Sequence, residues 1–269
     1  MTNTPPQLDL DAVRDGLEAA VAEAAAAILD VLDQSQIRVQ HKWGEGPVTE
    51  ADHAADDVLH RRLMPLVEGV HWLSEESRQE APLIHGEPTW VVDPLDGTRE
   101  FLRGILEFAV SAGLFAGGRL LLGAVALPVQ GQVLSGLLSG ERREARRNGE
   151  PLPALPLDGT VERVVVSRHD YERREIHRQI PYAVYPCGSA AVKLAHVATG
   201  EADVYLSTGP RSVWDVAGGA AVLEALGGAL LTYGNRPLEL SPQQVRVPAY
   251  VAGQPEACRT LLRRLGAPI

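Results

Sequence analysis

The sequence predicts a mixed α/β fold. Two observations support this class: the first half of the chain combines helical apolar spacing with several short strand-like runs, and in the second half strand-like and helical patterns alternate. With 269 residues, of which 45% are hydrophobic, the chain can bury a sizeable core. We expect a single unit, residues 1–269, built from approximate lobes at residues 1–150 and 151–269.

Two amphipathic helices are expected near the N-terminus. Apolar side chains recur at helical spacing over residues 8–32, which predicts a long helix with one buried face. A loop with glycines and a proline is expected at residues 40–48. Thr49, followed three residues later by Asp52, resembles a capping arrangement, so a second helix is expected to begin near Thr49.

Strands are expected after the second helix. Residues 70–73 and 89–92 are strand-like, and carboxylates follow both directly: Glu75 and Glu76 after the first, Asp93 after the second. An antiparallel meander is expected next, at residues 107–115, 120–127 and 132–138, and then a loop with an Asn-Gly turn at residues 146–158.

The second half of the chain alternates between two kinds of pattern. Strands are expected at residues 161–166, 182–185, 203–206, 229–232 and 249–252. Helices are expected at residues 189–199, 213–226 and 255–265. Such alternation indicates layered α/β structure.

Composition and charge argue against several functions. A formal net charge of −10 disfavours general binding to nucleic-acid polymers or anionic membranes, because both normally require a basic surface. No secretory signal is evident at residues 1–11, and the longest apolar stretch, residues 108–129, is interrupted by glycines as in a β-hairpin. The two cysteines, Cys187 and Cys258, lie far apart and fit free thiols in a reducing compartment. We therefore expect a cytoplasmic protein.

The most informative motif is Asp93-Pro94-Leu95-Asp96-Gly97-Thr98, in which a strand ends in an aspartate and the chain turns. Carboxylate oxygens are the natural ligands of hard cations such as Mg²⁺. Gly97 lets backbone amides approach a phosphate at the start of the following helix. Since carboxylates alone would repel a phosphate, a metal ion is needed to reverse the local charge.

Three further segments carry acidic residues at the ends of predicted elements. They are Thr49-Glu50-Ala51-Asp52, Trp72-Leu73-Ser74-Glu75-Glu76-Ser77 and Trp214-Asp215-Val216-Ala217-Gly218-Gly219. Each one alone is also explained by a helix cap, a tight turn or a solvated acidic pair. Only the combination of the four motifs favours a metal site.

Together these four segments resemble, in order and spacing, the signatures of the inositol-monophosphatase-like superfamily, from about residue 17 to residue 228. Residues 188–191 and 198–203 are similar too. The resemblance implies an αβαβα sandwich of the inositol monophosphatase and fructose-1,6-bisphosphatase type, and a Mg²⁺-dependent phosphomonoesterase. In this single phosphatase unit, the N-terminal lobe would hold most of the metal ligands, and the C-terminal lobe the substrate side and Asp215.

The resemblance also implies roles for individual residues. One Mg²⁺ would be held by Glu75, Asp93 and the Leu95 carbonyl, and a second by Asp93, Asp96 and Asp215; a third ion is left open. Asp52, Glu75 and Thr98 would orient and activate the attacking water, because bound metal lowers the pKa of water. Glu76 and Thr49 would support these groups. Substrate contacts are expected from Gly97, Thr98, Gly188, Ser189 and Arg211.

The residues after the central motif favour one branch. Asp96-Gly97-Thr98-Arg99-Glu100-Phe101 resembles the CysQ-type 3′(2′),5′-bisphosphate nucleotidases, although Arg99 replaces the usual lysine and Gly44-Glu45-Gly46 stands where that branch has an Asp and a Ser. The implied reaction converts adenosine 3′,5′-bisphosphate to AMP and phosphate. Cationic donors for the second phosphate are sought among Arg99, Arg168, Lys193 and Arg211.

Two alternatives stay open at this point. The same catalytic residues could serve an inositol monophosphatase or a fructose-1,6-bisphosphatase. A non-catalytic protein that binds metal and a phosphonucleotide is an alternative of another class. In every case the expected partner is a small phosphorylated metabolite, with a homodimer as a further open expectation.

Overall fold

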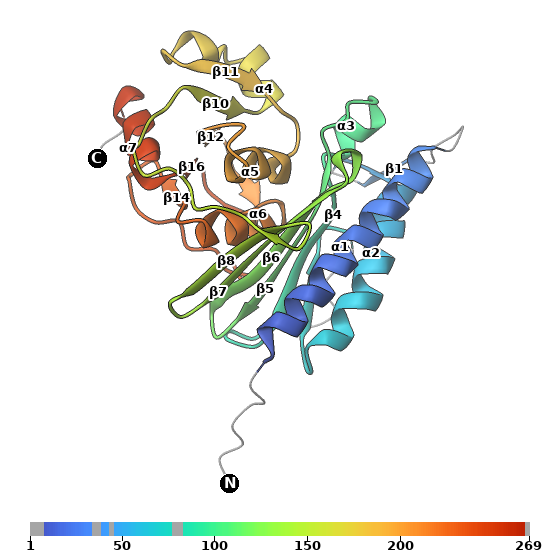
Figure 1. Ribbon diagram of the computed structural model, residues 1–269. Coiled ribbons are helices and arrows are strands. Elements are labelled where there is room, and N and C mark those ends of the chain that lie inside the picture. Colours follow the sequence, from blue (N-terminus) through green and yellow to red (C-terminus); the bar gives the residue numbers. More distant parts are fainter. Residues whose placement is uncertain (1–7, 34–38, 43–45, 77–82, 267–269) are drawn as a thin grey trace.

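Two β-sheets alternate with three layers of helices (Figure 1). In the computed structural model, which describes residues 8–33, 39–42, 46–76 and 83–266, helices α1 (Leu10–Leu32) and α2 (Glu50–Leu63) cover one face of a seven-stranded sheet. Helices α5 (Ala190–Ala198) and α6 (Val213–Ala225) lie between the two sheets. Helix α7 (Pro255–Arg264) packs on the outer face of the second sheet. The expected αβαβα sandwich is confirmed.

The seven-stranded sheet has the strand order β3-β4-β5-β6-β7-β8-β9. Its strands are β3 (His71–Ser74), β4 (Thr89–Asp96), β5 (Ala109–Ala116), β6 (Arg119–Leu127), β7 (Gln132–Ser139), β8 (Arg142–Arg147) and β9 (Glu150–Pro151). Neighbours pair antiparallel except β3 and β4, which are parallel. Because parallel strands end at the same edge of a sheet, the carboxylates that follow β3 and β4 are brought together.

The second sheet has five strands in the order β11-β10-β12-β16-β14. They are β10 (Arg163–Val166), β11 (Ala183–Pro186), β12 (Val204–Ser207), β14 (Ala229–Thr232) and β16 (Tyr250–Gly253). Strand β10 pairs parallel with β11 and β12, whereas β16 pairs antiparallel with β12 and β14. The five strands expected in the second half of the chain are all found, within a few residues of the expected bounds.

Several short elements differ from the expectations. The loop expected at residues 40–48 contains an antiparallel pair, β1 (Val39–Lys42) and β2 (Gly46–Thr49); residues 43–45, part of the glycine loop noted above, lie outside the described residues. The loop expected at residues 146–158 begins too early, because β8 runs to Arg147 and Asn148, with φ 51°, starts a tight turn into β9. The remaining short elements are η1 (Met64–Leu66), α3 (Thr98–Leu102), η2 (Pro128–Gln130), α4 (Arg168–Glu172), η3 (Ile176–Arg178), β13 (Arg211–Ser212) and β15 (Arg246–Val247).

Helix α6 lies unusually close to the large sheet. A Cβ atom at Gly136 of β7 would stand 2.3 Å from the carbonyl oxygen of Ala221, and one at Gly218 of α6 would stand 2.4 Å from that of Ala124. Glycine is therefore required on both sides of the contact, since a larger residue would separate helix and sheet. This contact fixes the start of α6, which carries Asp215, against the sheet.

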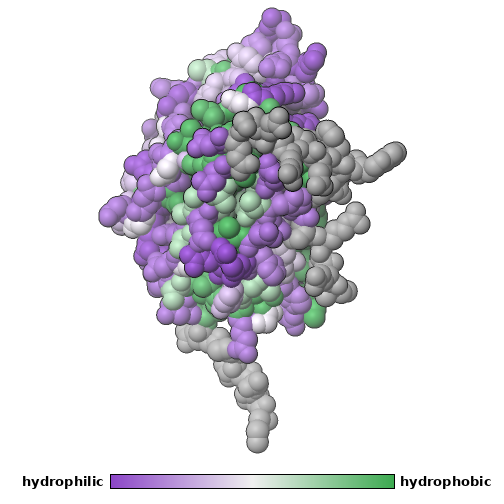
Figure 2. All heavy atoms as spheres, turned by 90° about the vertical axis from the view of Figure 1, so that its right-hand side faces the viewer, coloured by the Kyte–Doolittle hydropathy of each residue, from purple (hydrophilic) through white to green (hydrophobic). Residues whose placement is uncertain are grey.

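The side of the molecule that carries α1 and α2 shows hydrophilic and apolar residues intermixed on its surface (Figure 2). Apolar residues of α1, such as Leu17 and Ile28, are instead fully buried against the sheet. Among the described residues, none of the helices combines the length and the apolar character that a membrane crossing requires.

Candidate active site

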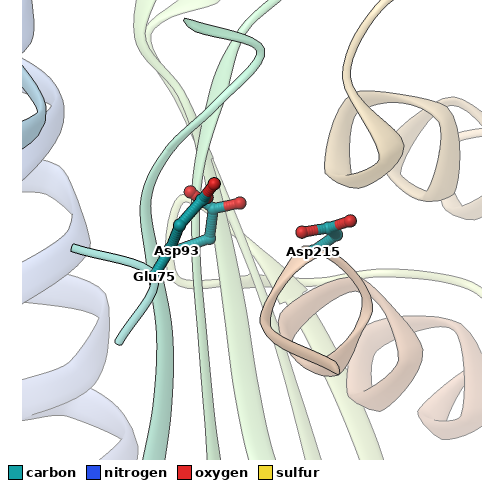
Figure 3. Close-up of side chains that lie close together, drawn as sticks. All are labelled: Glu75, Asp93 and Asp215. Atoms are coloured by element: carbon teal, nitrogen blue, oxygen red, sulfur yellow. The ribbon is translucent and has the colours of Figure 1, made fainter. Parts of the chain in front are cut away.

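Three carboxylates from distant parts of the chain meet at one edge of the large sheet (Figure 3). Glu75 follows β3, Asp93 belongs to β4, and Asp215 lies in the first turn of α6. Each offers an oxygen, and these atoms all lie within 4.8 Å of one another. We call this set the three-carboxylate group. It unites acidic residues from three of the four motifs found in the sequence.

The local structure of β4 explains how Asp93 is presented. The pairing of β4 with β5 shifts register between Asp93 and Asp96, which marks a bulge where Pro94 cannot donate a hydrogen bond. The Asp93 side chain is 1% exposed, and its Oδ1 accepts a hydrogen bond from the Leu95 amide at 3.1 Å. Gly97 then turns the chain with φ 106°, where an added Cβ would stand 2.8 Å from the Glu107 carbonyl oxygen.

Asp215 is held by a capping box at the start of α6. Its Oδ2 accepts a hydrogen bond from the Ser212 amide at 3.0 Å. The helix N-terminus favours negative charge at this position. The Ser212 bond fixes the rotamer of Asp215, so that the carboxylate reaches the other two acidic side chains without further reorganisation.

Burial and mutual repulsion disfavour ionisation of the group. Burial, followed by repulsion from Asp215, raises the pKa of Glu75 to about 8. Burial, followed by repulsion from Asp96, raises the pKa of Asp215 to about 7, and burial holds the pKa of Asp93 well above its usual range. A divalent cation would relieve this repulsion, and an all-oxygen donor set suits a hard ion such as Mg²⁺. The residues present therefore fit the metal that the sequence predicts.

Asp96 lies beside the three-carboxylate group but is not part of it. Its Oδ2 accepts two hydrogen bonds of 2.6 Å, one from the Ser189 hydroxyl and one from the Ala191 amide. Its charge contributes to the raised pKa values of Glu75, Asp93 and Asp215, which places it in their neighbourhood. Its predicted role as a metal ligand stays a prediction.

Thr98 and Asp52 form a hydrogen-bonded pair next to the group. The Thr98 hydroxyl lies 3.1 Å from Asp52 Oδ1 and also 3.1 Å from the Leu95 carbonyl oxygen. On its other side, Asp52 Oδ2 accepts hydrogen bonds from the Thr49 amide at 2.7 Å and the Thr49 hydroxyl at 2.6 Å. The predicted capping arrangement at Thr49 is thus confirmed, as a capping box. Burial raises the pKa of Asp52 to about 6 despite these bonds.

The predicted supporting residue Glu76 also lies near the site. Its amide donates to the Ser74 hydroxyl at 3.3 Å, and its negative charge contributes to the raised pKa values of Glu75 and Asp52. The Ser74 hydroxyl in turn donates to Asp56 at 2.6 Å, which ties the end of β3 to α2. The role of Asp56 has no signal in the sequence, because nothing local distinguishes a buried helical aspartate that makes this contact.

Several of the residues that are predicted to contact the substrate form hydrogen bonds within the protein. The Gly188 amide donates to Glu107 at 2.8 Å, and the Ser189 hydroxyl is fully buried on Asp96. Arg211 donates through Nε to the Tyr205 hydroxyl at 3.3 Å and through one terminal nitrogen to the Pro210 carbonyl at 3.0 Å. Substrate binding by Gly97, Thr98, Gly188, Ser189 and Arg211 stays a prediction.

Two of the candidate cationic donors already bind other groups of the protein. Lys193 is fully buried, and its ammonium group donates to three backbone carbonyl oxygens, so the expectation that it binds a substrate phosphate is corrected. Arg168 forms an ion pair with Glu107, whereas Arg99 is exposed.

The two cysteines, Cys187 and Cys258, are buried free thiols, as expected.

Known proteins are similar to this chain over most of its length. Residues 9–264 match the inositol monophosphatase family. The 3′(2′),5′-bisphosphate nucleotidase CysQ of Escherichia coli strain K12 is 34% identical over 233 residues, which cover 82% of this chain and 91% of that protein. Inositol monophosphatase 1 of Solanum lycopersicum is 27% identical over 243 residues, covering 86% and 88% of the two chains. The solved inositol monophosphatase of Anabaena (Nostoc) sp. PCC 7120 has a TM-score of 0.77 at 26% identity and covers 96% of each chain.

The αβαβα sandwich and the acidic site at its sheet edge define a phosphatase of the kind that depends on a metal ion. The chain belongs to the inositol monophosphatase family. Its similarity to its curated relatives identifies it as a hydrolase that resembles the 3′(2′),5′-bisphosphate nucleotidases.

Proposed function

We propose that this protein is a Mg²⁺-dependent 3′(2′),5′-bisphosphate nucleotidase that hydrolyses adenosine 3′,5′-bisphosphate to AMP and phosphate. The single observation that carries the proposal is the three-carboxylate group, whose oxygens lie within 4.8 Å of one another. The similarity to CysQ over 91% of that protein's length supports this choice of substrate. We further propose that the enzyme acts in the cytoplasm.

Residues from both predicted lobes would hold the metal ions. Glu75, Asp93 and the Leu95 carbonyl would hold one Mg²⁺, and Asp93, Asp96 and Asp215 a second, so that Asp93 is shared. The raised pKa values of Glu75 and Asp215 support this assignment, because a divalent ion is the missing counter-charge. When bound, Mg²⁺ supplies Lewis acidity at the phosphoryl oxygens and lowers the pKa of the attacking water.

Thr98 and Asp52 would accept the proton that the attacking water releases. The Thr98 hydroxyl can accept a hydrogen bond from water while it donates its own hydrogen to Asp52, at 3.1 Å. Since burial raises the pKa of Asp52 to about 6, this carboxylate is suited to receive a proton near neutral pH. Glu75 would help to orient the water, and Thr49 would keep Asp52 oriented through its two hydrogen bonds.

Among the basic side chains that the structure describes, Arg211 is the one best placed to bind a second phosphate. It lies four residues before Asp215, and its positive charge lowers the otherwise raised pKa of that aspartate. A guanidinium group can donate two parallel hydrogen bonds to a phosphate, which favours a bisphosphate over a monophosphate.

A substrate panel tests the proposal. Phosphate release should be measured from adenosine 3′,5′-bisphosphate, inositol 1-phosphate and fructose 1,6-bisphosphate, with Mg²⁺ and with a chelator. We expect the nucleotide to have the highest kcat/KM, and release to stop both with chelator and in Asp93→Asn. The exposed Asp57 provides a matched control, Asp57→Asn, which should retain activity. Faster hydrolysis of inositol 1-phosphate or fructose 1,6-bisphosphate would reject the nucleotidase assignment, and binding without any hydrolysis would leave only a metal and phosphonucleotide binder.

A further inference from the structure

Lys193 is buried behind the candidate active site with all of its hydrogen-bonding capacity in use. The side chain is 0% exposed, and its ammonium nitrogen donates to the carbonyl oxygens of Cys187 at 2.9 Å, Gly188 at 2.7 Å and Ser189 at 2.6 Å. The nitrogen also lies 5.2 Å from the centre of the Tyr205 ring, within the range of a cation–π contact. An ammonium group has three donors, so none is left for a substrate.

The turn that Lys193 holds is the one that grips Asp96. Three successive carbonyls, at residues 187–189, face the lysine. From the same stretch of chain, the Ser189 hydroxyl and the Ala191 amide both donate to Asp96 Oδ2 at 2.6 Å. Ser189 is also the N-cap of α5, since its hydroxyl oxygen accepts a hydrogen bond from the Val192 amide at 3.0 Å. One turn therefore presents carbonyls to a buried cation and donors to a carboxylate of the site.

We propose that Lys193 is a positioning residue of the metal centre: by fixing the carbonyls of residues 187–189, it directs Ser189 and Ala191 onto Asp96 and so holds that carboxylate beside the three-carboxylate group. The inference rests on the proposed function, in which Asp96 binds Mg²⁺. Lys193 touches neither substrate nor metal, and its effect passes through the turn.

A lysine suits this position better than other polar residues. The three acceptors surround one point, and a tetrahedral ammonium group on a flexible stem can direct one N–H to each of them. A glutamine amide has only two N–H donors, and the planar guanidinium group of arginine spreads its donors in a fixed fork.

The test compares Mg²⁺ binding with catalysis in a set of full-length variants. Isothermal titration with Mg²⁺ alone, followed by measurement of kcat at saturating Mg²⁺, should be carried out on wild type, Lys193→Met, Lys193→Arg, Ser189→Ala and the double variant Lys193→Met/Ser189→Ala. His196→Gln is the matched control. His196 lies on the same helix and pairs with the Tyr185 hydroxyl at 3.1 Å, so this change also removes a polar contact from α5, but not one in the turn.

We expect Lys193→Met to weaken Mg²⁺ binding by about 10- to 100-fold, the usual effect of removing a group that orients a metal ligand. Lys193→Arg should lose less, and Ser189→Ala should change binding in the same direction. Because both residues act on Asp96, the Mg²⁺ affinity of the double variant should lie within about twofold of that of the single variant that binds Mg²⁺ more weakly. His196→Gln should match wild type in Mg²⁺ binding.

Two results would overturn the inference while leaving the proposed function intact. One is Mg²⁺ binding and kcat in Lys193→Met within about twofold of wild type, and the other is losses that multiply in the double variant. Should Lys193→Met fail to fold, as judged by circular dichroism, Lys193→Arg takes its place in the cycle with Ser189→Ala and decides by the same criterion. A wild-type protein that binds no Mg²⁺ would instead reject the proposed function, and the inference with it.

Discussion

The Thr98 hydroxyl donates a hydrogen bond to Asp52 Oδ1 at 3.1 Å, although the two residues are 46 positions apart in the sequence. The contact joins the start of α3 to the start of α2, and both starts face the edge of the sheet where Glu75 and Asp93 lie. Helix N-termini at this edge place a potential proton acceptor and a hydroxyl next to the carboxylates. The pair is therefore the natural first target for mutagenesis.

Replacement of Thr98 by alanine is predicted to reduce kcat by about 10²- to 10⁴-fold, the range expected for loss of a group in general acid–base catalysis. The fold should be retained, because the Thr98 side chain does not cap α3. Steady-state kinetics at saturating Mg²⁺ and a thermal melt check both parts. Thr98→Ser, which keeps the hydroxyl, is the control and should recover most of the activity; equal kcat values for Thr98→Ala and wild type would contradict the proposed role.

The metal-free protein is predicted to become less stable as the pH rises from about 4 to 8. Folding raises the pKa of Asp52 from 3.8 to about 6, that of Asp215 from 3.8 to about 7, and that of Glu75 from 4.5 to about 8. Between the unfolded and folded pKa values the folded state binds more protons than the unfolded state, so stability falls with rising pH in that window. Well below pH 3.8, the lowest unfolded value, the three groups are protonated in both states and this loss is absent.

Mg²⁺ should reverse this trend. Its ligands must be deprotonated, so binding strengthens as the pH rises, and the gain in melting temperature on adding Mg²⁺ should be larger at pH 8 than at pH 6. Melting curves at pH 5 to 8.5, with chelator and with Mg²⁺, measure both effects. A melting temperature that climbs from pH 6 to pH 8 in chelator would contradict the prediction.

The main elements of the fold could be predicted from local patterns, and the shortest could not. The apolar spacing of residues 8–32 and the runs of the meander are long enough to show a period, and α1 and β5 to β7 lie where expected. Strands β13 and β15 have two residues each, and α4 has five. Such segments are too short for any periodic signal, and their conformations depend on tertiary packing.

The candidate site divides in the same way. Acidic residues at the ends of β3 and β4 could be found because a strand end followed by carboxylates is a local feature, and parallel pairing then brings Glu75 near Asp93. Contacts such as the Ala191 amide on Asp96, across 95 residues, have no local signal. Lys193 differs from the expected candidate phosphate donor for the same reason: its charge is visible in the sequence, but its burial is not.

The close contact between α6 and the large sheet provides a third prediction. Gly136→Ala would place a Cβ atom 2.3 Å from the Ala221 carbonyl oxygen, and backbone on both sides leaves no flexible group to yield. We expect a loss of about 1–3 kcal/mol in the free energy of unfolding. Since α6 carries Asp215, displacement of the helix should weaken Mg²⁺ binding as well.

Gly234→Ala serves as the control for this variant. An added Cβ there would meet its nearest atom, the Thr232 hydroxyl oxygen, at 3.8 Å, an ordinary contact. Denaturant unfolding and Mg²⁺ titration on both variants separate the effects. If Gly136→Ala matched Gly234→Ala in both measurements, the glycine contact would not be what positions α6.

Arg211 provides the last prediction, which concerns the choice of substrate. Its Nε and one terminal nitrogen already donate to Tyr205 and Pro210, so the guanidinium group is held in place at the start of α6. A fixed guanidinium group loses little conformational entropy on binding a phosphate, and removing it should raise KM for adenosine 3′,5′-bisphosphate by about 10-fold, or about 1.4 kcal/mol. Hydrolysis of inositol 1-phosphate, which has no second phosphate, should change less than threefold, roughly half of that free energy. Arg211→Ala should therefore be compared on both substrates with a control at an exposed arginine of α7, Arg264→Ala. Equal losses on both substrates in Arg211→Ala would mean that Arg211 supports the metal centre and does not select the bisphosphate.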